Sequence, residues 1–197
     1  MPDVPTSFRQ DWTRLWNLAE RLTTAHPHSD VFSDPEDPST VLGFAGLFLE
    51  PPDDPGDGWS EYVNSPRNAI TFGSTGVDGV HFCALFGPAD APTTTIVLCV
   101  PLADEPNHVV GTSLAEFLAL GCRTGYHLDP LAYDFRETMI EELQAQQLSE
   151  EPERVFLLEA LTEEFNLGPW PDVAPRLAEL KTQYAADIAW TPYPTLG

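Results

Sequence analysis

Apolar side chains recur at helical spacing near the N-terminus and throughout the last third of the chain. Residues 7–25 carry Phe8, Trp12, Leu15, Ala19 and Leu22 at steps of three or four, which predicts an amphipathic helix. Ser7 and Gln10 have the spacing of a capping box at its start. The same apolar spacing predicts helices over 136–148, 150–166 and 172–189. Stripes of this kind are typical of helix faces that pack on a hydrophobic core.

Between these helical regions the pattern changes to one that is typical of strands. Alternating or β-branched residues predict strands over 68–73, 80–86, 94–100 and 109–110. The segment GPADAPT, residues 87–93, predicts a hairpin loop between the second and third of these strands. A helix is expected over 113–120, with Ser113 and Glu116 as a capping box and Gly121 as a left-handed C-cap.

The order of these elements predicts an α+β fold, in which a central, mostly antiparallel sheet is flanked by helices. We expect one domain over residues 1–197, with an α+β core over 1–130 and a helical C-terminal extension over 131–197 packed on that core. Within the core, residues 28–66 are acidic and rich in proline, which predicts loops. The apolar run 41–49 interrupts them as a strand or a buried loop.

The stretch TFGSTGVDGVHF, residues 71–82, contains the residue types of several functional sites. It lacks the lysine of a phosphate-binding loop, the spacing of a dinucleotide fingerprint and the glycine that precedes the serine of a nucleophile elbow. Ser74, Asp78 and His81 supply the groups of a catalytic triad, so a hydrolase or nucleotide-binding enzyme using Ser74 and His81 stays an alternative. Asp-Gly is a favoured hairpin dipeptide, and Asp78-Gly79 therefore favours a tight turn.

Two sets of residues contain metal-ligating groups, and neither has the ligand spacing that is expected of a metal site. If Phe86 pairs with Thr94, antiparallel register places His81 opposite Cys99 and on one face with Cys83, a set that could bind zinc. Zinc sites usually have two ligands close together on a turn, and buried cysteine more often acts as a small apolar residue. The segment DDPGDG, residues 53–58, lacks the alternating acids of a calcium loop. We therefore expect no metal, no cofactor and three reduced cysteines.

The charge balance is strongly acidic, with 31 acidic and 9 basic residues and a net charge of −22. Nucleic acids and anionic membranes bind cationic surfaces, so both are disfavoured as direct partners. A basic partner is favoured, and solubility is the alternative explanation for the charge. The sequence shows no apolar run of membrane-spanning length and no signal-peptide pattern at its start. A cytoplasmic protein is therefore expected.

An acidic loop is the candidate for partner binding. Residues 30–61 contain no lysine or arginine, and loops commonly carry functional residues. A tryptophan among acids is typical of an interface anchor surrounded by charges that steer a basic surface. The alternative is that the indole packs back on the core. The candidate partner-binding residues are Asp53, Asp54, Asp57, Trp59 and Glu61.

Three segments together resemble the SUKH superfamily, the Smi/Knr-like proteins, whose bacterial members carry a segment similar to F-x-STGGDGVHF. The lead-in NSPRNAITF, the strand TIVLCVP and the helix VVGTSLAEFLALGC are also similar to that family. Val77 replaces the expected glycine, and the resemblance covers about residues 60–125. The matching residues are Phe72, Ser74, Thr75, Gly76, Asp78, Gly79, His81, Phe82, Ser113, Leu114, Glu116, Phe117 and Leu118.

The resemblance implies an α+β fold and a function in binding rather than catalysis. Bacterial members are linked to immunity against secreted polymorphic toxins, many of them nucleases, which they neutralise by binding. The family has no agreed catalytic residues, so none is assigned here. We expect a non-enzymatic immunity protein for a basic toxin domain. Other members are regulatory scaffolds, so an adaptor for an endogenous protein stays an alternative.

Overall fold

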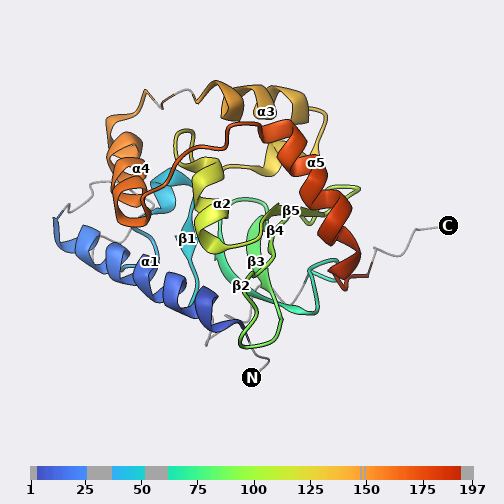
Figure 1. Ribbon diagram of the computed structural model, residues 1–197. Helices are drawn as coiled ribbons and strands as arrows, with labels where there is room; N and C mark the ends of the chain where they lie inside the picture. The colour runs from blue at the N-terminus through green and yellow to red at the C-terminus, as the bar shows by residue number, and fades with distance from the viewer. Residues whose placement is uncertain (1–3, 26–36, 52–61, 147, 149, 192–197) are drawn as a thin grey trace.

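A five-stranded antiparallel sheet forms the centre of the fold (Figure 1). The computed structural model describes residues 4–25, 37–51, 62–146, 148 and 150–191. The strand order β1-β2-β3-β4-β5 follows the chain, and each strand pairs antiparallel with the next. The strands are β1 Phe48–Leu49, β2 Ala69–Ser74, β3 His81–Leu85, β4 Ile96–Cys99 and β5 Asn107–Gly111.

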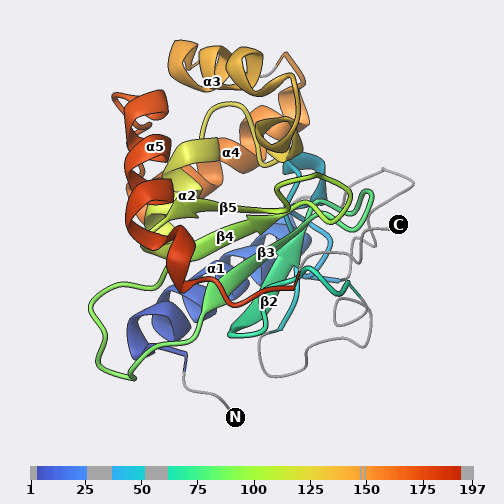
Figure 2. The same ribbon diagram turned by 90° about the vertical axis from the view of Figure 1, so that its right-hand side faces the viewer.

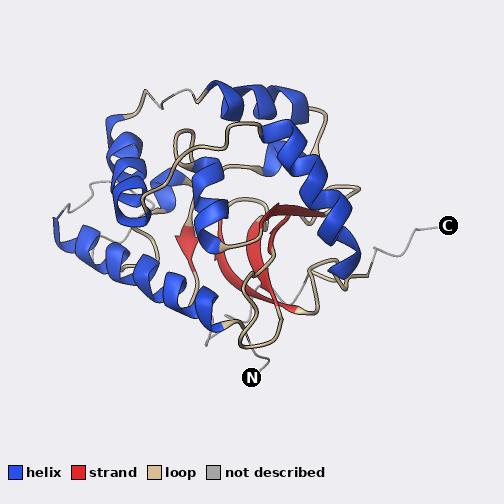
Figure 3. Ribbon diagram, viewed as in Figure 1, coloured by secondary structure: helices blue, strands red, loops and turns tan. Residues whose placement is uncertain are grey.

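Along the chain, helices precede and follow the strands and do not alternate with them. Figure 3 shows the helices lying around the strands. The helix α1 comes before every strand, and α2 to α5 come after the last one. This segregation confirms the expected α+β class. The α-helices are α1 Thr6–Ala25, α2 Leu114–Gly121, α3 Arg136–Ala145, α4 Pro152–Phe165 and α5 Val173–Tyr184. Short 3-10 turns occur at η1 Gly43–Ala45, η3 Asp129–Ala132 and η4 Ala185–Asp187.

One face of the sheet packs on α1 and α2 through a cluster of aromatic rings. The ring of Phe117 on α2 lies 4.8 Å from that of Phe82 and 5.8 Å from that of Phe72, between centroids. Phe8 on α1 lies 5.4 Å from Phe72 in an edge-on arrangement. All four rings are buried, and such pairs add to the stabilisation from burial alone. Three of the residues that match the SUKH-like segments are thus core residues, namely Phe72, Phe82 and Phe117.

The chain after α5 crosses the other face of the sheet, the face away from α1 (Figure 2). The backbone N–H of Arg67 donates to the carbonyl of Ala189 at 2.7 Å. The side chain of Asn68 donates to the carbonyl of Asp187 at 2.8 Å and accepts from the N–H of Ala189 at 2.9 Å. These bonds hold the C-terminal segment against the start of β2, and Ile188 between them is buried.

The last two helices and the loop between them are attached to the core by side chains as well as by packing. Trp170 donates its indole N–H to the carbonyl of Glu116 on α2 at 3.0 Å. Arg176 on α5 pairs with the Glu116 carboxylate at 2.8 Å. Arg154 on α4 donates to the carbonyl of Phe44 in η1 at 3.0 Å. Because these contacts join segments more than 50 residues apart, the C-terminal third and the core support each other.

Two of the predicted helix ends are wrong. The helix α1 begins at Thr6, so Ser7 lies in its first turn and is not the N-cap. Gly121 is the last residue of α2 and has no left-handed backbone, whereas Gly125 does, with φ +101°. A Cβ at Gly121 would lie 2.6 Å from the ring of Tyr126. Glycine is needed there for close packing, which local sequence does not reveal.

The predicted capping box at the start of α2 is confirmed, with one change of hydrogen-bond partner. Ser113 is the N-cap of α2 and accepts from the N–H of Glu116 at 3.0 Å. The Glu116 carboxylate reaches back to the N–H of Thr112 at 2.6 Å, one residue before the expected partner. The apolar run 41–49 contains both η1 and β1 and is largely buried.

The described part of the chain contains no helix that is both long and apolar enough to cross a membrane.

Candidate functional site

The glycine-rich stretch forms a tight turn between β2 and β3. Asp78 and Gly79 both have positive φ, 50° and 71°, and the N–H of Val80 donates to the carbonyl of Val77 at 2.9 Å. Positive φ at both central residues defines a type I′ turn, which matches the twist of the strands it joins. A Cβ at Gly79 would collide with the ring of Tyr62. The interpretation of Asp78-Gly79 as a hairpin turn is confirmed.

His81 lies directly after this turn and is fully buried. Its Nδ1 lies 2.7 Å from the carbonyl oxygen of Gly79, and its Nε2 lies 3.1 Å from the hydroxyl of Ser65. A carbonyl only accepts, so Nδ1 carries the proton and Nε2 accepts from the serine. The imidazole also stacks on Tyr62, with ring centroids 6.2 Å apart. His81 therefore connects the β2–β3 turn to the segment 62–65.

The surroundings of His81 favour its neutral form. Burial lowers the pKa of His81 to about 4, although the hydrogen bond to the Gly79 carbonyl opposes this effect. At neutral pH the ring is therefore an uncharged hydrogen-bonding group. This arrangement suits a structural connection between two loops.

The structure does not arrange Ser74, Asp78 and His81 as a catalytic triad. Ser74 and His81 are opposite each other in the β2–β3 register, and both are buried. The serine that hydrogen-bonds the imidazole is Ser65, however, which lies 16 positions before it. The carboxylate of Asp78 belongs to the exposed end of the turn. The group that orients Nδ1 is a backbone carbonyl, that of Gly79.

The two sheet cysteines have the predicted register. His81 is opposite Cys99 and Cys83 is opposite Val97. The Cys83 sulfur lies 3.6 Å from the hydroxyl of Thr71, and the Cys99 sulfur lies 3.9 Å from that of Ser65. Burial raises the pKa of Cys99 to about 12 and raises that of Cys83 further. Within the described ranges, no three His, Cys, Asp or Glu side chains are grouped so as to hold a metal.

His81 belongs to a row of paired residues that marks one end of the sheet. Ser74 pairs with His81, His81 with Cys99, and Cys99 with Asn107. The β2–β3 turn and the β4–β5 connection both leave the sheet beyond this row. The segment 62–65 lies beside them, since Asn64 donates to the carbonyl of Pro101 at 2.7 Å and accepts from the Asn107 side chain at 2.9 Å.

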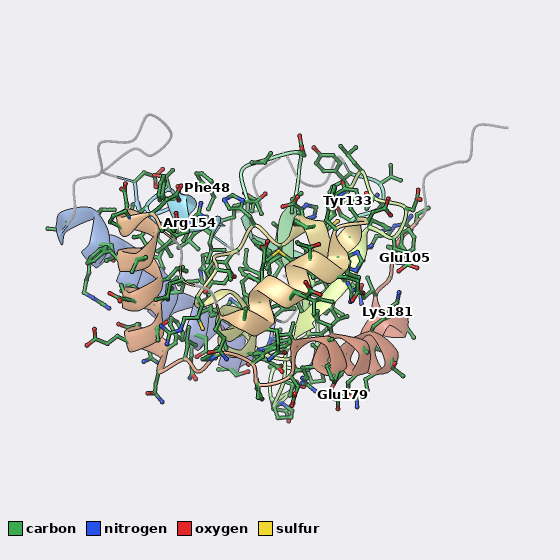
Figure 4. All side chains as sticks on the ribbon, turned by 90° about the horizontal axis from the view of Figure 1, so that it is seen from above. Phe48, Glu105, Tyr133, Arg154, Glu179 and Lys181 are labelled. Carbon is green, nitrogen blue, oxygen red and sulfur yellow. The ribbon has the colours of Figure 1, made fainter. Side chains whose placement is uncertain are left out.

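The loop between α2 and α3 reaches the same end of the sheet. Partial burial raises the pKa of Tyr133, and the charges of Asp129 and of Asp78 in the β2–β3 turn add to this effect. The ion pair with Lys181 is the main cause that lowers the pKa of Glu105 in the β4–β5 connection, and the charge of Arg136 adds a smaller contribution. Figure 4 shows Tyr133 and Glu105 at one end of the molecule, away from Arg154. We call residues 62–65, 75–80, 100–106 and 127–136 the loop-end surface.

The loop-end surface exposes an unusual number of large apolar side chains. Seven such side chains are exposed in the described part of the chain, and five of them lie here. Leu102 is 70% exposed and Phe135 is 69% exposed. The other three are Val63, Val77 and Tyr133. Grouped exposed apolar residues on a soluble protein often mark a site of interaction.

Acidic residues surround these apolar side chains. Asp78, Asp104, Glu105 and Asp134 are exposed, and Asp129 is half-buried. The only arginine or lysine within the four segments is Arg136, and its guanidinium donates to the carbonyl of Leu131 at 2.8 Å. The loop-end surface thus combines exposed apolar groups with negative charge.

The candidate partner-binding residues Asp53, Asp54, Asp57, Trp59 and Glu61 lie outside the described residues. Sequence reasoning did not find Leu102, Tyr133 or Phe135. The sequence feature that could have indicated them is a large apolar residue close to acids in a turn-forming segment. It occurs in PLADEP, residues 101–106, and in LAYDFRE, residues 131–137. Gly76, another residue that matches the SUKH-like segments, has a positive φ of 75° as Gly79 does. A Cβ at Gly76 would lie 2.6 Å from the ring of Phe48.

Comparison with known proteins adds no identification. None of the protein-family models that were searched matches the chain. A search of curated proteins found no significant match either.

Proposed function

We propose that the protein is a non-enzymatic binding protein of the immunity type, which binds and neutralises a basic toxin domain in the cytoplasm of a bacterial host. The observation that carries this proposal is the acid excess that the fold leaves uncompensated. Nine bases cannot neutralise 31 acids. Among the residues that the structure describes, five of the nine are held in ion pairs with acids of the same chain: Arg14, Arg21, Arg154, Arg176 and Lys181.

An uncompensated negative field has a definite physical effect on association. It raises the rate of encounter with a basic protein and repels nucleic acids and anionic membranes. A nuclease must itself carry a basic surface to hold its substrate. An acidic protein that covers such a surface therefore blocks the substrate by occupying the same site.

The resemblance of residues 60–125 to the SUKH superfamily supports the same proposal. Its motif residues act here as structural groups: Phe72, Phe82 and Phe117 are in the aromatic core, and His81 connects two loops. A scaffold of this kind presents loops for binding. The second candidate, an adaptor for an endogenous protein, would use the same scaffold.

Partner capture followed by a growth assay tests the proposal. The purified chain is used as bait in extract of the native host, and an unrelated acidic protein of similar net charge is the control bait. The captured protein is identified by mass spectrometry and expressed with and without the chain. We expect its expression to arrest growth and co-expression of the chain to restore it. A captured partner without toxicity would favour the adaptor, and identical captures by both baits would contradict specific binding.

A further inference from the structure

We propose that the loop-end surface is the face that binds the basic protein partner, with Tyr133 and Phe135 as apolar anchors and Asp78, Asp104 and Asp134 as the acids that meet its cations. The existence of a protein partner rests on the proposed function. The location of its binding face rests on independent observations, which are the clustering of exposed apolar side chains, the charge around them and the rigidity of the loops that carry them.

The apolar side chains are exposed although the fold has a large buried core. Leu102 and Phe135 are each about 70% exposed, and they come from connections that lie beside one another at one end of the sheet. Large apolar and aromatic groups supply most of the binding energy in protein interfaces when a partner removes them from water. Their concentration at this end distinguishes it from the rest of the described surface.

The charge of the surface selects the chemistry of the partner. Within the loop-end surface the chain contributes five acids, and Arg136 is the one arginine or lysine. Carboxylates beside an aromatic ring fit a lysine or arginine side chain, because the cation pairs with the acid while its stem or guanidinium covers the ring. Nucleic acid and anionic lipid would be repelled. The surface therefore fits a protein that presents lysine or arginine around an apolar patch.

The loops are held in place before any partner binds. The type I′ turn fixes residues 77–80, and His81 connects that turn to Ser65. Two backbone hydrogen bonds hold the segment around Tyr133. The N–H of Tyr133 donates to the carbonyl of Pro130 at 3.2 Å, and the N–H of Arg136 donates to the carbonyl of Tyr133 at 3.0 Å. A surface that is already ordered loses less conformational entropy on binding.

Photo-crosslinking in the native host is the first test. The photoreactive residue p-benzoylphenylalanine replaces Phe135 or Leu102 in the full chain, and Leu148, which is 54% exposed outside the loop-end surface, is the matched position. We expect the same adduct at positions 135 and 102, none at 148, and loss of the adduct when excess unmodified chain competes. Adducts at 148 alone, equal adducts at all three positions, or none at 135 and 102 would overturn the proposal.

The second test uses the captured protein, purified, in surface plasmon resonance against variants of the chain. The double variant Tyr133→Ala, Phe135→Ala should weaken binding by about 30-fold or more, mainly through faster dissociation, as expected for interface anchors. Leu148→Ala is the matched control and should change affinity less than about twofold. Circular dichroism and a urea titration confirm that each variant is folded, and a folded double variant with wild-type affinity would overturn the proposal.

The charge contribution is tested with two sets of three substitutions that change the net charge equally. The first set is Asp78→Asn, Asp104→Asn and Asp134→Asn, and asparagine keeps the positive φ of position 78 accessible. The control set is Asp90→Asn, Glu159→Gln and Glu163→Gln, exposed acids outside the loop-end surface. The first set should slow association about 10-fold at low salt and reduce its salt dependence, and the control set should have a much smaller effect. Equal effects of the two sets would mean that only net charge matters.

The outcomes separate this inference from the proposed function. Specific adducts at positions 135 and 102 to a protein that is not toxic would keep the binding face and remove the immunity function. A toxic partner whose affinity is unchanged by both loop-end variants would keep the immunity function and remove the binding face.

Discussion

The buried histidine predicts a specific loss of stability in mild acid. In the folded protein the pKa of His81 is lowered to about 4 from its ordinary 6.5, because burial disfavours the charged ring more than the hydrogen bond to the Gly79 carbonyl favours it. The unfolded chain binds a proton at His81 below pH 6.5 and the folded protein does not. The contribution of this group is therefore fully present above pH 6.5 and is lost as pH falls toward 4.

The magnitude follows from the two pKa values. With pKa 6.5 unfolded and about 4 folded, the loss of unfolding free energy between pH 7.5 and pH 5 is about 2 kcal/mol, and it approaches about 3 kcal/mol at pH 4. This is a large part of the total stability of an ordinary domain, which is about 5–15 kcal/mol. Stopping at pH 5 keeps most carboxylates ionised, so the histidine contribution is the larger change.

The assay is urea unfolding of the wild-type protein and His81→Gln at half-unit steps from pH 7.5 to 5. Glutamine keeps a neutral side chain that donates and accepts, so the variant should be less stable at pH 7.5 but should lack the histidine proton linkage. Burial also lowers the pKa values of His108 and His127, and their pH dependence is shared by both proteins. The difference in stability between wild type and variant should therefore shrink by about 2 kcal/mol toward pH 5. Parallel pH profiles would refute the reasoning.

Four further predictions concern the turn, the core, the histidine in binding and the acidic loop. Gly79→Val should lower the free energy of unfolding, measured by urea titration, by about 1–3 kcal/mol through backbone strain. Gly168→Val should lower it little, because a Cβ there meets open space. An unchanged urea midpoint for Gly79→Val would contradict the assigned turn. Phe117→Ala should cost about 3–5 kcal/mol, and Phe135→Ala, an exposed ring, under about 0.5 kcal/mol; similar losses would contradict the assigned core. His81→Ala should leave partner binding detectable by surface plasmon resonance while lowering stability. Charge reversal at Asp53, Asp54 and Asp57 should slow association at low salt and Trp59→Ala should speed dissociation, and an unchanged association rate would exclude that loop as a steering surface.

The strands and their register could be predicted because both depend on local pattern. Residues 87–93 join two alternating segments, and a hairpin loop of known length fixes which residues face each other. The pairing of His81 with Cys99 and of Cys83 with Val97 is as predicted. The turn at Asp78-Gly79 could be predicted as well. It needs positive φ at two successive positions, and few residue types adopt that backbone conformation.

The hydrogen-bond partner of His81 could not be read from the sequence in the same way. The nearby serine suggested by sequence was Ser74, on the neighbouring strand. The serine found is Ser65, from a segment placed by the bonds of Asn64 to Pro101 and Asn107. Those bonds span more than 35 positions of the chain, and no local pattern encodes them.

The sequence by itself determined the α+β class, the helices, the register of β3 with β4, the tight turn and the excess of negative charge. Each of these follows from residue type, from the spacing of apolar side chains or from the conformations open to a few neighbouring residues. Tertiary structure alone decided that Gly121 makes room for the ring of Tyr126 and that His81 binds Ser65. It also decided that Val63, Val77, Leu102 and Tyr133 meet at one end of the sheet, because only packing of the whole chain brings segments so far apart in sequence onto one surface.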